Sequence, residues 1–328
     1  MATRRRKSRK RRQERDLVMP LIAAGGALLT AAEIARRVYR HTQLFLPSPE
    51  PVKSWNPADY GIPLGAVEEQ WFETPDGEEL YGWYCRAKKP IASALFCHGN
   101  TGNLTVSADI IPHLLNAGIN VLFFDYRGFG KSSGTASING VVSDGITAAR
   151  FHHKIRPKNV PSILYGFSLG GAVAAQVIKR HPFDGLILQS TFTSLPDITR
   201  VLFPTIPMHL LAGNLFNTLS VVKRLTVPLL VIHGADDEVA PSWMAHSLHD
   251  HCAAEKKAIH IVDSGMHKDL YVRDCDSLVW TINQFATGLP RNTREIPLER
   301  APRTEEWLDA ALRFIRRTVR RRMASQSL

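Results

Sequence analysis

The hydrophobic positions of the chain fall into short, uniformly apolar runs separated by stretches with the composition of helices. Helices are expected at Pro112–Ala117, Ile138–His153 and Gly171–Arg180. The apolar runs, which we expect to be strands, cover Ser93–Cys97, Ile119–Phe124, Ile163–Tyr165, Leu186–Leu188, Leu229–Ile232 and Ile259–Val262. Strands that are apolar throughout and alternate with helices are typical of a mostly parallel sheet covered on both faces. The pattern therefore predicts an α/β protein.

The residues ahead of the first apolar run follow a different pattern. Val67–Thr74 and Leu80–Arg86 are strand-like, and the turn sequence Pro75-Asp76-Gly77 lies between them, which predicts a hairpin. Before the hairpin, the chain is rich in proline and aromatic residues without clear periodicity. We therefore expect residues 39–65 to be a linker laid onto the surface of a domain that spans residues 66–290.

A serine lies at a sharp predicted change of chain direction. Gly166-Phe167-Ser168-Leu169-Gly170 separates an apolar run from a helical stretch, which predicts strand, tight turn and helix with Ser168 at the apex. The two glycines fit this geometry, because a Cβ at either position would clash where the chain folds back. The serine hydroxyl would then stand clear of the sheet, and the Leu169 amide at the helix N-terminus would face a developing oxyanion. Taken alone, such a pentapeptide also occurs by chance in loops.

Three more chemically active groups follow predicted strands. They are His98-Gly99-Asn100, the acidic group Asp236-Asp237-Glu238, and His267. Reactive groups gather at the carboxyl ends of parallel strands, so we expect these side chains to meet Ser168 at one edge of the sheet. The order Ser, Asp, His is the order that a nucleophile elbow requires of its triad. The coincidence of these positions argues against a chance loop and predicts a catalytic triad.

His267 is the expected base among the 13 histidines of the chain, since it combines a glycine-bearing loop with a place after the last strand. His98 and His233 each end a strand before a glycine and are expected to make structural hydrogen bonds. The second oxyanion donor is expected in the loop after His98, at Asn100 or, as a second choice, Thr101. Several further histidines fall in stretches expected to be polar helix, namely His152, His153, His246, His249 and His251.

A family resemblance is carried by segments spread over residues 66–287. They are Phe96–Asn103, Phe124–Ser132, Tyr165–Gly171, Gln189–Leu195, Val231–Val239 and Gly265–His267. In these segments the chain resembles serine hydrolases of the α/β-hydrolase superfamily. More narrowly, it resembles a membrane-anchored subfamily that includes α/β-hydrolase-domain thioesterases and serine-aminopeptidase-like hydrolases. Gln189 departs from the pattern, because many relatives carry an acidic residue there.

The resemblance implies a role for each site residue. Ser168 would be the nucleophile, His267 the base, and the backbone amides of Leu169 and Asn100 the oxyanion donors. The spacing D-x-V-x-P from Asp237 to Pro241 resembles the acid loop of the superfamily and selects Asp237 as the acid, with Asp236 as the fallback. The fold that it implies has a mostly parallel central sheet with helices on both faces and a small lid.

The N-terminal segment combines a basic tail, residues 1–16, with an apolar stretch. Leu17–Ala32 holds sixteen uncharged residues, which as a helix span about 24 Å against a hydrocarbon core of about 30 Å. We expect residues 17–38 to be a single-pass membrane anchor with its N-terminus in the cytoplasm. A cleaved signal peptide and a soluble helix packed on the domain are the alternatives. Basic residues on both sides leave the orientation of the catalytic domain open.

Two other segments add to this picture. Phe192–Leu225 is a long, apolar connection beside the expected site, and we interpret it as a small lid that either lines an acyl pocket or packs only its own side chains. Residues 291–328 form a basic extension in which 304–322 predict an amphipathic helix. That helix would dock on the domain or lie on anionic lipid.

Charge and cysteine usage narrow the function classes. The net charge of +11 is confined to the ends, because residues 17–302 balance 25 basic with 25 acidic residues. A nucleic-acid binder is therefore not favoured. The four cysteines, at 85, 97, 252 and 275, show no metal-ligand spacing, and Cys85 and Cys97 are expected to be buried free thiols.

The sequence thus predicts a serine hydrolase that cleaves a carboxylic ester or thioester through an acyl-enzyme, with no cofactor and no metal. Its substrate would be a small-molecule or lipid acyl compound. A peptidase or amidase is the alternative within enzymes, and a non-catalytic membrane-tethered scaffold is the alternative outside them.

Overall fold

The computed structural model describes residues 44–205 and 216–290. These residues belong to the first of two units, Met1–Asn292 and Thr293–Leu328. The expected anchor, both basic ends, the C-terminal helix and the centre of the expected lid lie outside the described residues. Among the helices that are described, none has both the length and the apolar character needed to cross a bilayer.

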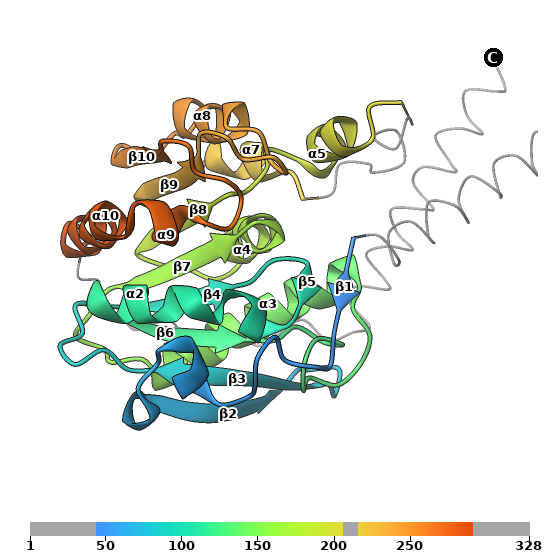
Figure 1. The fold of residues 1–328 in the computed structure, drawn as a ribbon, viewed down its shortest axis with the longest axis vertical. Coiled ribbons are helices and arrows are strands. Elements are labelled where there is room, and N and C mark those ends of the chain that lie inside the picture. Colours follow the sequence, from blue (N-terminus) through green and yellow to red (C-terminus); the bar gives the residue numbers. More distant parts are fainter. Residues whose placement is uncertain (1–43, 206–215, 291–328) are drawn as a thin grey trace, which may run out of the picture. The chain divides into compact units, whose positions relative to one another are not determined.

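An eight-stranded sheet forms the centre of the fold, with the strands in the order β10-β9-β8-β7-β4-β6-β3-β2 (Figure 1). Neighbours from β10 to β6 are parallel, whereas β3 pairs antiparallel with both β6 and β2. The strands are β2 (Val67–Glu73), β3 (Glu79–Cys85), β4 (Ala92–Cys97), β6 (Ile119–Phe124), β7 (Ser162–Phe167), β8 (Gly185–Gln189), β9 (Leu229–Gly234) and β10 (Lys257–Val262). The predicted mostly parallel α/β sheet is confirmed.

Helices cover both faces of the sheet. One face packs against α2 (Ile111–Asn116), α9 (Leu270–Arg273) and α10 (Cys275–Thr287), together with the 3-10 turns η1 (Pro57–Tyr60) and η3 (Leu104–Ile110). The other packs against α3 (Ile138–Ile155), α4 (Leu169–Ile178), α5 (Leu195–Leu202), α7 (Thr218–Val222) and α8 (Trp243–Asp250). Within β6, Leu122 faces one core and Phe123 the other. Central strands are therefore buried on both faces, which explains why they are apolar throughout.

The predicted elements are present, and their ends differ by a few residues. The expected hairpin forms from β2 and β3 around the turn at Asp76. Helix α3 begins where expected because the Ser137 hydroxyl caps it by accepting a hydrogen bond from Gly140 N at 3.1 Å. Helix α4 begins two residues earlier than expected, at Leu169, directly after the serine.

The described part of the expected linker is built into the domain rather than laid onto it. Phe45, Tyr60 and Ile62 are buried in the two cores. A short strand, β1 (Leu46–Pro47), pairs in parallel with β5 (Thr101–Gly102). The side chains of Phe45, Tyr60 and Ile62 enter the core from a segment that is mostly irregular backbone. Their positions therefore show no helical or strand period, and periodicity does not identify them as core residues.

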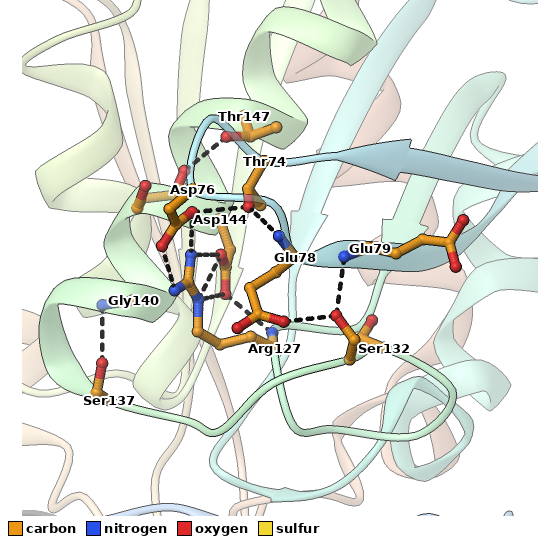
Figure 2. Close-up of polar contacts among 12 residues, drawn as sticks. Thr74, Asp76, Glu78, Glu79, Arg127, Ser132, Ser137, Gly140, Asp144 and Thr147 are labelled. Carbon is orange, nitrogen blue, oxygen red and sulfur yellow. Dashed lines mark hydrogen bonds and ion pairs between the residues drawn. The ribbon is translucent and has the colours of Figure 1, made fainter. Parts of the chain in front are cut away.

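A buried ion pair ties the loop after β6 to the hairpin turn and to α3 (Figure 2). The Arg127 guanidinium donates to Asp144 Oδ1 at 2.9 Å and to Asp76 Oδ2 at 2.7 Å. Asp144 also accepts a hydrogen bond from the backbone N–H of Arg127 at 2.9 Å, and its side chain is fully buried, whereas that of Asp76 is 47% exposed. The hydrogen bond from Arg127 lowers the pKa of Asp76 to about 2. One arginine thus joins segments that are far apart in the chain.

A cluster of histidines lies on the α3 side of the fold, where polar helix was expected. His152 is fully buried, with Nε2 2.9 Å from Ser93 Oγ and its ring stacked on Phe183. His181 lies beside His153, with 5.8 Å between ring centroids. Burial, reinforced by nearby Arg156, lowers the pKa of His152 far below its usual value and that of His153 to about 4. Burial also lowers the pKa of His181.

All four cysteines are free thiols, and the prediction for Cys85 and Cys97 is confirmed. Burial raises the pKa of each of these two thiols to about 12.

We predict that Asp144→Asn lowers the free energy of unfolding by about 3–5 kcal/mol, because it removes the fully buried charge partner of Arg127 and leaves only the half-exposed Asp76. The matched change Asp76→Asn removes the half-exposed partner of the same arginine and is expected to cost less than about 1 kcal/mol. Urea denaturation of both variants measures the difference. Equal losses would contradict the assignment of Asp144 as the dominant partner.

We also predict that stability declines as the pH falls from about 6.5 towards about 4. The unfolded chain takes up protons on His152 and His153 in this range, while the folded protein keeps them neutral, so protonation favours unfolding. His153→Gln should reduce the slope of unfolding free energy against pH in this window. The exposed His246 provides the control, since His246→Gln should leave the slope unchanged. A slope that His153→Gln does not alter would refute the prediction.

Candidate active site

Ser168 occupies a strained position between β7 and α4. Its backbone has φ 53° and ψ −120°, a conformation that residues other than glycine rarely adopt. A Cβ on Gly166 would lie 2.4 Å from Gly171 Cα, and one on Gly170 would lie 1.9 Å from the Cys97 carbonyl oxygen. Both glycines are therefore required by the close approach of backbone that was expected at this turn.

The neighbouring strand β8 holds the turn in place. Ser168 N donates to the Gln189 carbonyl at 2.9 Å, and the Thr191 hydroxyl donates to the Ser168 carbonyl at 2.6 Å. With both its backbone donor and its acceptor engaged, the serine cannot relax its dihedral angles without breaking these bonds. The hydroxyl therefore keeps a fixed direction at the carboxyl end of β7.

His267 reaches the serine from the loop after β10. Its Nε2 lies 3.0 Å from Ser168 Oγ, and its ring packs against Phe167 with 5.4 Å between centroids. The His267 backbone N–H donates to Glu238 Oε2 at 3.1 Å. The residue is 5% exposed, so water has little access to the hydrogen bond between imidazole and hydroxyl.

Asp237 lies on the far side of the imidazole. His267 Nδ1 donates to Asp237 Oδ2 at 2.8 Å, which leaves Nε2 unprotonated and able to accept the serine proton. The other carboxylate oxygen accepts hydrogen bonds from the backbone N–H groups of Val239 and Ala240. Asp237 is buried, whereas Asp236 is exposed. The geometry therefore gathers Ser168, His267 and Asp237 and leaves the fallback acid Asp236 outside.

His233 adds a contact that sequence reasoning missed. Its Nε2 lies 2.7 Å from the Ala240 carbonyl and 3.2 Å from Asp237 Oδ2. Burial alone raises the pKa of Asp237, but the hydrogen bonds from His233 and His267 outweigh it and hold that pKa well below the usual value. The carboxylate is thus kept charged beside the imidazole. The sequence signal was present, since His233 lies near the end of β9, four residues before Asp237, but it indicated only a structural histidine.

The loop after β4 lies against the serine. A Cβ on Gly99 would be 3.6 Å from Ser168 Cβ, which places Gly99, the residue before Asn100, next to the serine. His98 Nδ1 is 2.8 Å from the Gly99 carbonyl, and His98 Nε2 is 3.4 Å from the fully buried Asp125. The expected structural role of His98 is confirmed by these contacts. Leu169, as the first residue of α4, carries one of the N–H groups that a helix leaves without an intrahelical acceptor.

A hydroxyl, an imidazole and a buried carboxylate in hydrogen-bonded series can deprotonate the hydroxyl and stabilise the imidazolium that results. Within the described ranges, the His, Cys, Asp and Glu side chains form no group of three that could hold a metal ion.

Comparison with known proteins agrees with this geometry. Residues 88–223 match the family model described as serine aminopeptidase, S33. An uncharacterized protein of Mycobacterium tuberculosis is 30% identical over 273 residues, covering 82% of this chain and 93% of that protein. An Arabidopsis thaliana protein described as α/β-hydrolase domain-containing is 28% identical, over 77% of this chain and 86% of its own length. An uncharacterized membrane protein of Saccharomyces cerevisiae is 27% identical, over 78% of this chain and 93% of its own length.

The chain belongs to the α/β-hydrolase superfamily. A solved Pyrococcus furiosus esterase shares the fold, with a TM-score of 0.61 and 19% sequence identity, over 74% of this chain and 97% of that structure. In this α/β-hydrolase, Gln189 is buried and accepts a hydrogen bond from the Tyr165 hydroxyl, which lies 3.0 Å from the Tyr271 hydroxyl. Gln189, the residue that departs from the expected family pattern, is thus part of a neutral hydrogen-bonded group in the core.

We predict that Asp237→Asn lowers kcat for an aryl ester by up to about 10⁴-fold, because an amide in place of the carboxylate no longer fixes the productive imidazole tautomer. Asp236→Asn provides the matched control on the adjacent, exposed position and should leave kcat near the wild-type value. Steady-state kinetics with p-nitrophenyl acetate measures both. A large loss in the Asp236 variant with none in the Asp237 variant would reverse the assignment.

Proposed function

We propose that this α/β-hydrolase is a serine hydrolase that cleaves carboxylic esters or thioesters through an acyl-enzyme intermediate. The observation that carries the proposal is the continuous series from Ser168 Oγ to His267 Nε2 at 3.0 Å, and from His267 Nδ1 to the buried Asp237 at 2.8 Å. Ser168 is the proposed nucleophile, His267 the general base and Asp237 the acid that orients it.

In the proposed reaction, the Ser168 oxygen attacks the acyl carbonyl while His267 takes its proton. The carbonyl oxygen becomes an oxyanion, which the backbone amides of Leu169 and Asn100 stabilise as donors. Collapse of this intermediate expels the alcohol or thiol, which receives the proton from His267. Water then attacks the acyl-enzyme by the same sequence and releases the carboxylic acid, so that the enzyme is regenerated without a cofactor.

A peptidase or amidase is the second candidate, because the matching family model is that of a serine aminopeptidase. It uses the same three residues and differs in the leaving group, an amine that must be protonated as it departs. Rates on an ester and an amide with the same acyl group distinguish the two, since a peptidase should cleave both whereas an esterase should cleave the ester and leave the amide intact.

The proposed setting is a membrane, with residues 17–38 as the anchor. The yeast relative that is named a membrane protein supports this setting. The described flanks of the expected lid contribute Leu195, Ile198 and Val222 to the core on one side of the sheet.

We predict that a fluorophosphonate probe labels the wild-type protein and fails to label Ser168→Ala, because the probe requires an activated serine. Ser264→Ala is the matched control, since Ser264 also has a positive φ, lies close to His267 in the sequence and is exposed. This control should label as the wild type does. Labelling of Ser168→Ala would show that the nucleophile is another residue.

A chain-length series of aryl esters and acyl thioesters then ranks the acyl groups by kcat/KM. A folded wild-type protein that neither labels nor turns over any of these substrates would overturn the hydrolase proposal and favour a non-catalytic scaffold.

A further inference from the structure

The segment from Phe45 to Val52, which we call the strap, is joined along its length to the loop that carries Asn100. Leu46 N donates to the Asn100 carbonyl at 2.8 Å, and Ser48 N donates to the Gly102 carbonyl at 2.8 Å. Further along, Val52 N donates to the Thr105 hydroxyl at 2.9 Å. The strap thus follows the loop from Asn100 to the start of η3.

The loop and the core also hold the strap in return. The Asn103 amide group donates to the carbonyls of Ser48 and Glu50, at 3.0 and 2.7 Å. Asn103 itself is fully buried and caps η3 by accepting a hydrogen bond from Thr105 N at 3.0 Å. At the other end, Phe45 is 3% exposed and contacts Phe129 edge to face. The strap is therefore fixed to the core at its start and to the loop along its length.

The two peptide groups on either side of Asn100 are each held by one hydrogen bond. The Gly99 carbonyl, which shares a planar peptide with the Asn100 N–H, lies 2.8 Å from His98 Nδ1. The next peptide, which contains the Asn100 carbonyl, is held by Leu46 N. His98 therefore orients the amide from inside the protein, and the strap fixes the following peptide from outside.

We propose that the strap is a positioning element for the oxyanion site, in which Leu46 acts through the Asn100 peptide rather than on substrate. This inference rests on the proposed function, since it assigns Asn100 N–H as an oxyanion donor. An oxyanion donor accelerates the reaction only if its direction is set before the charge develops. The backbone N–H of Leu46, and not its half-exposed side chain, sets that direction.

The strap sequence fits this role. Pro47, which has no N–H, lies between the two donors Leu46 and Ser48, at the position where a strand turns its N–H away from its partner. Leu46 and Ser48 are the positions that need an N–H for the ladder. Each can accordingly be tested by a pair of substitutions that differ in whether the N–H is kept.

The test compares Leu46→Pro, which removes the N–H, with Leu46→Ala, which keeps it while shortening the side chain. For an aryl ester, Leu46→Pro is expected to lower kcat by at least about tenfold. This loss should be smaller than the roughly 10²–10³-fold loss of kcat that follows complete removal of an oxyanion donor. KM should change little, because the ground-state carbonyl makes weaker use of the donor. Leu46→Ala should keep kcat close to the wild-type value.

A boronic acid that forms a tetrahedral adduct on the serine gives an independent readout. Its affinity should fall in Leu46→Pro by the same factor as kcat/KM and stay unchanged in Leu46→Ala. Thermal melting identifies any general loss of folding, and Ser48→Pro with its control Ser48→Ala supplies a second pair if Leu46→Pro does not fold. The Ser48 pair should show the same pattern, because Ser48 N holds the next turn of the loop.

The proposal is wrong if a folded proline variant has the kcat and boronic acid affinity of its alanine control. It is also wrong if KM rises while kcat is unchanged, because the strap would then act on substrate binding alone. Failure of the wild-type protein to label with fluorophosphonate is a separate outcome, since it overturns the hydrolase function itself and this inference with it.

Discussion

The close approach of two backbones, at the end of β4 and the start of α4, is the constraint on which the site depends. The Cys97 carbonyl and Gly170 lie so near each other that only hydrogen can occupy the space between them. This contact brings the Ser168 turn and the Gly99 loop together before any side chain is considered. The serine and the proposed oxyanion amides consequently share one rigid piece of structure, formed by adjacent parallel strands.

Buried carboxylates complete that rigid piece, and each is compensated in a different way. Asp237 is surrounded by N–H donors and stays charged beside His267. Asp144 accepts from Arg127 and thereby fixes the loop after β6 to α3. Asp125, at the start of the same loop, accepts from Leu104 N and lies 3.4 Å from His98, and burial raises its pKa, which favours the neutral form. An unpaired buried charge is costly, so these partners restrict the loops to one arrangement.

The predictions that succeeded rest on local patterns. Uniformly apolar strands gave the sheet, and the order of Ser168, Asp237 and His267 at strand ends anticipated which side chains would meet. The features that were missed depend on contacts between distant residues. Two such pairings form only when the chain folds: that of Arg127 with Asp76 and Asp144, and that of His233 with Asp237. The residues next to them in the sequence do not indicate these pairings.

The choice of Asp237 over Asp236 came from a resemblance, whereas the physical reason is burial, because Asp237 is buried and Asp236 is exposed. His152 lies in the expected helix α3, but its full burial is a feature that its polar neighbours in the sequence did not indicate.

The burial of Phe45, Tyr60 and Ile62 changes where the hydrolase unit begins. Sequence periodicity places its start near residue 66, and the family model matches only from residue 88. A chain shortened to residue 66 would keep every triad residue yet expose the aromatic contacts of Phe129 and Trp83 to water. The smallest recombinant fragment that retains the described core therefore starts no later than residue 44. Shorter fragments that contain Ser168, Asp237 and His267 would be poor reagents for assigning substrates, since their inactivity would reflect a truncated fold rather than the choice of substrate.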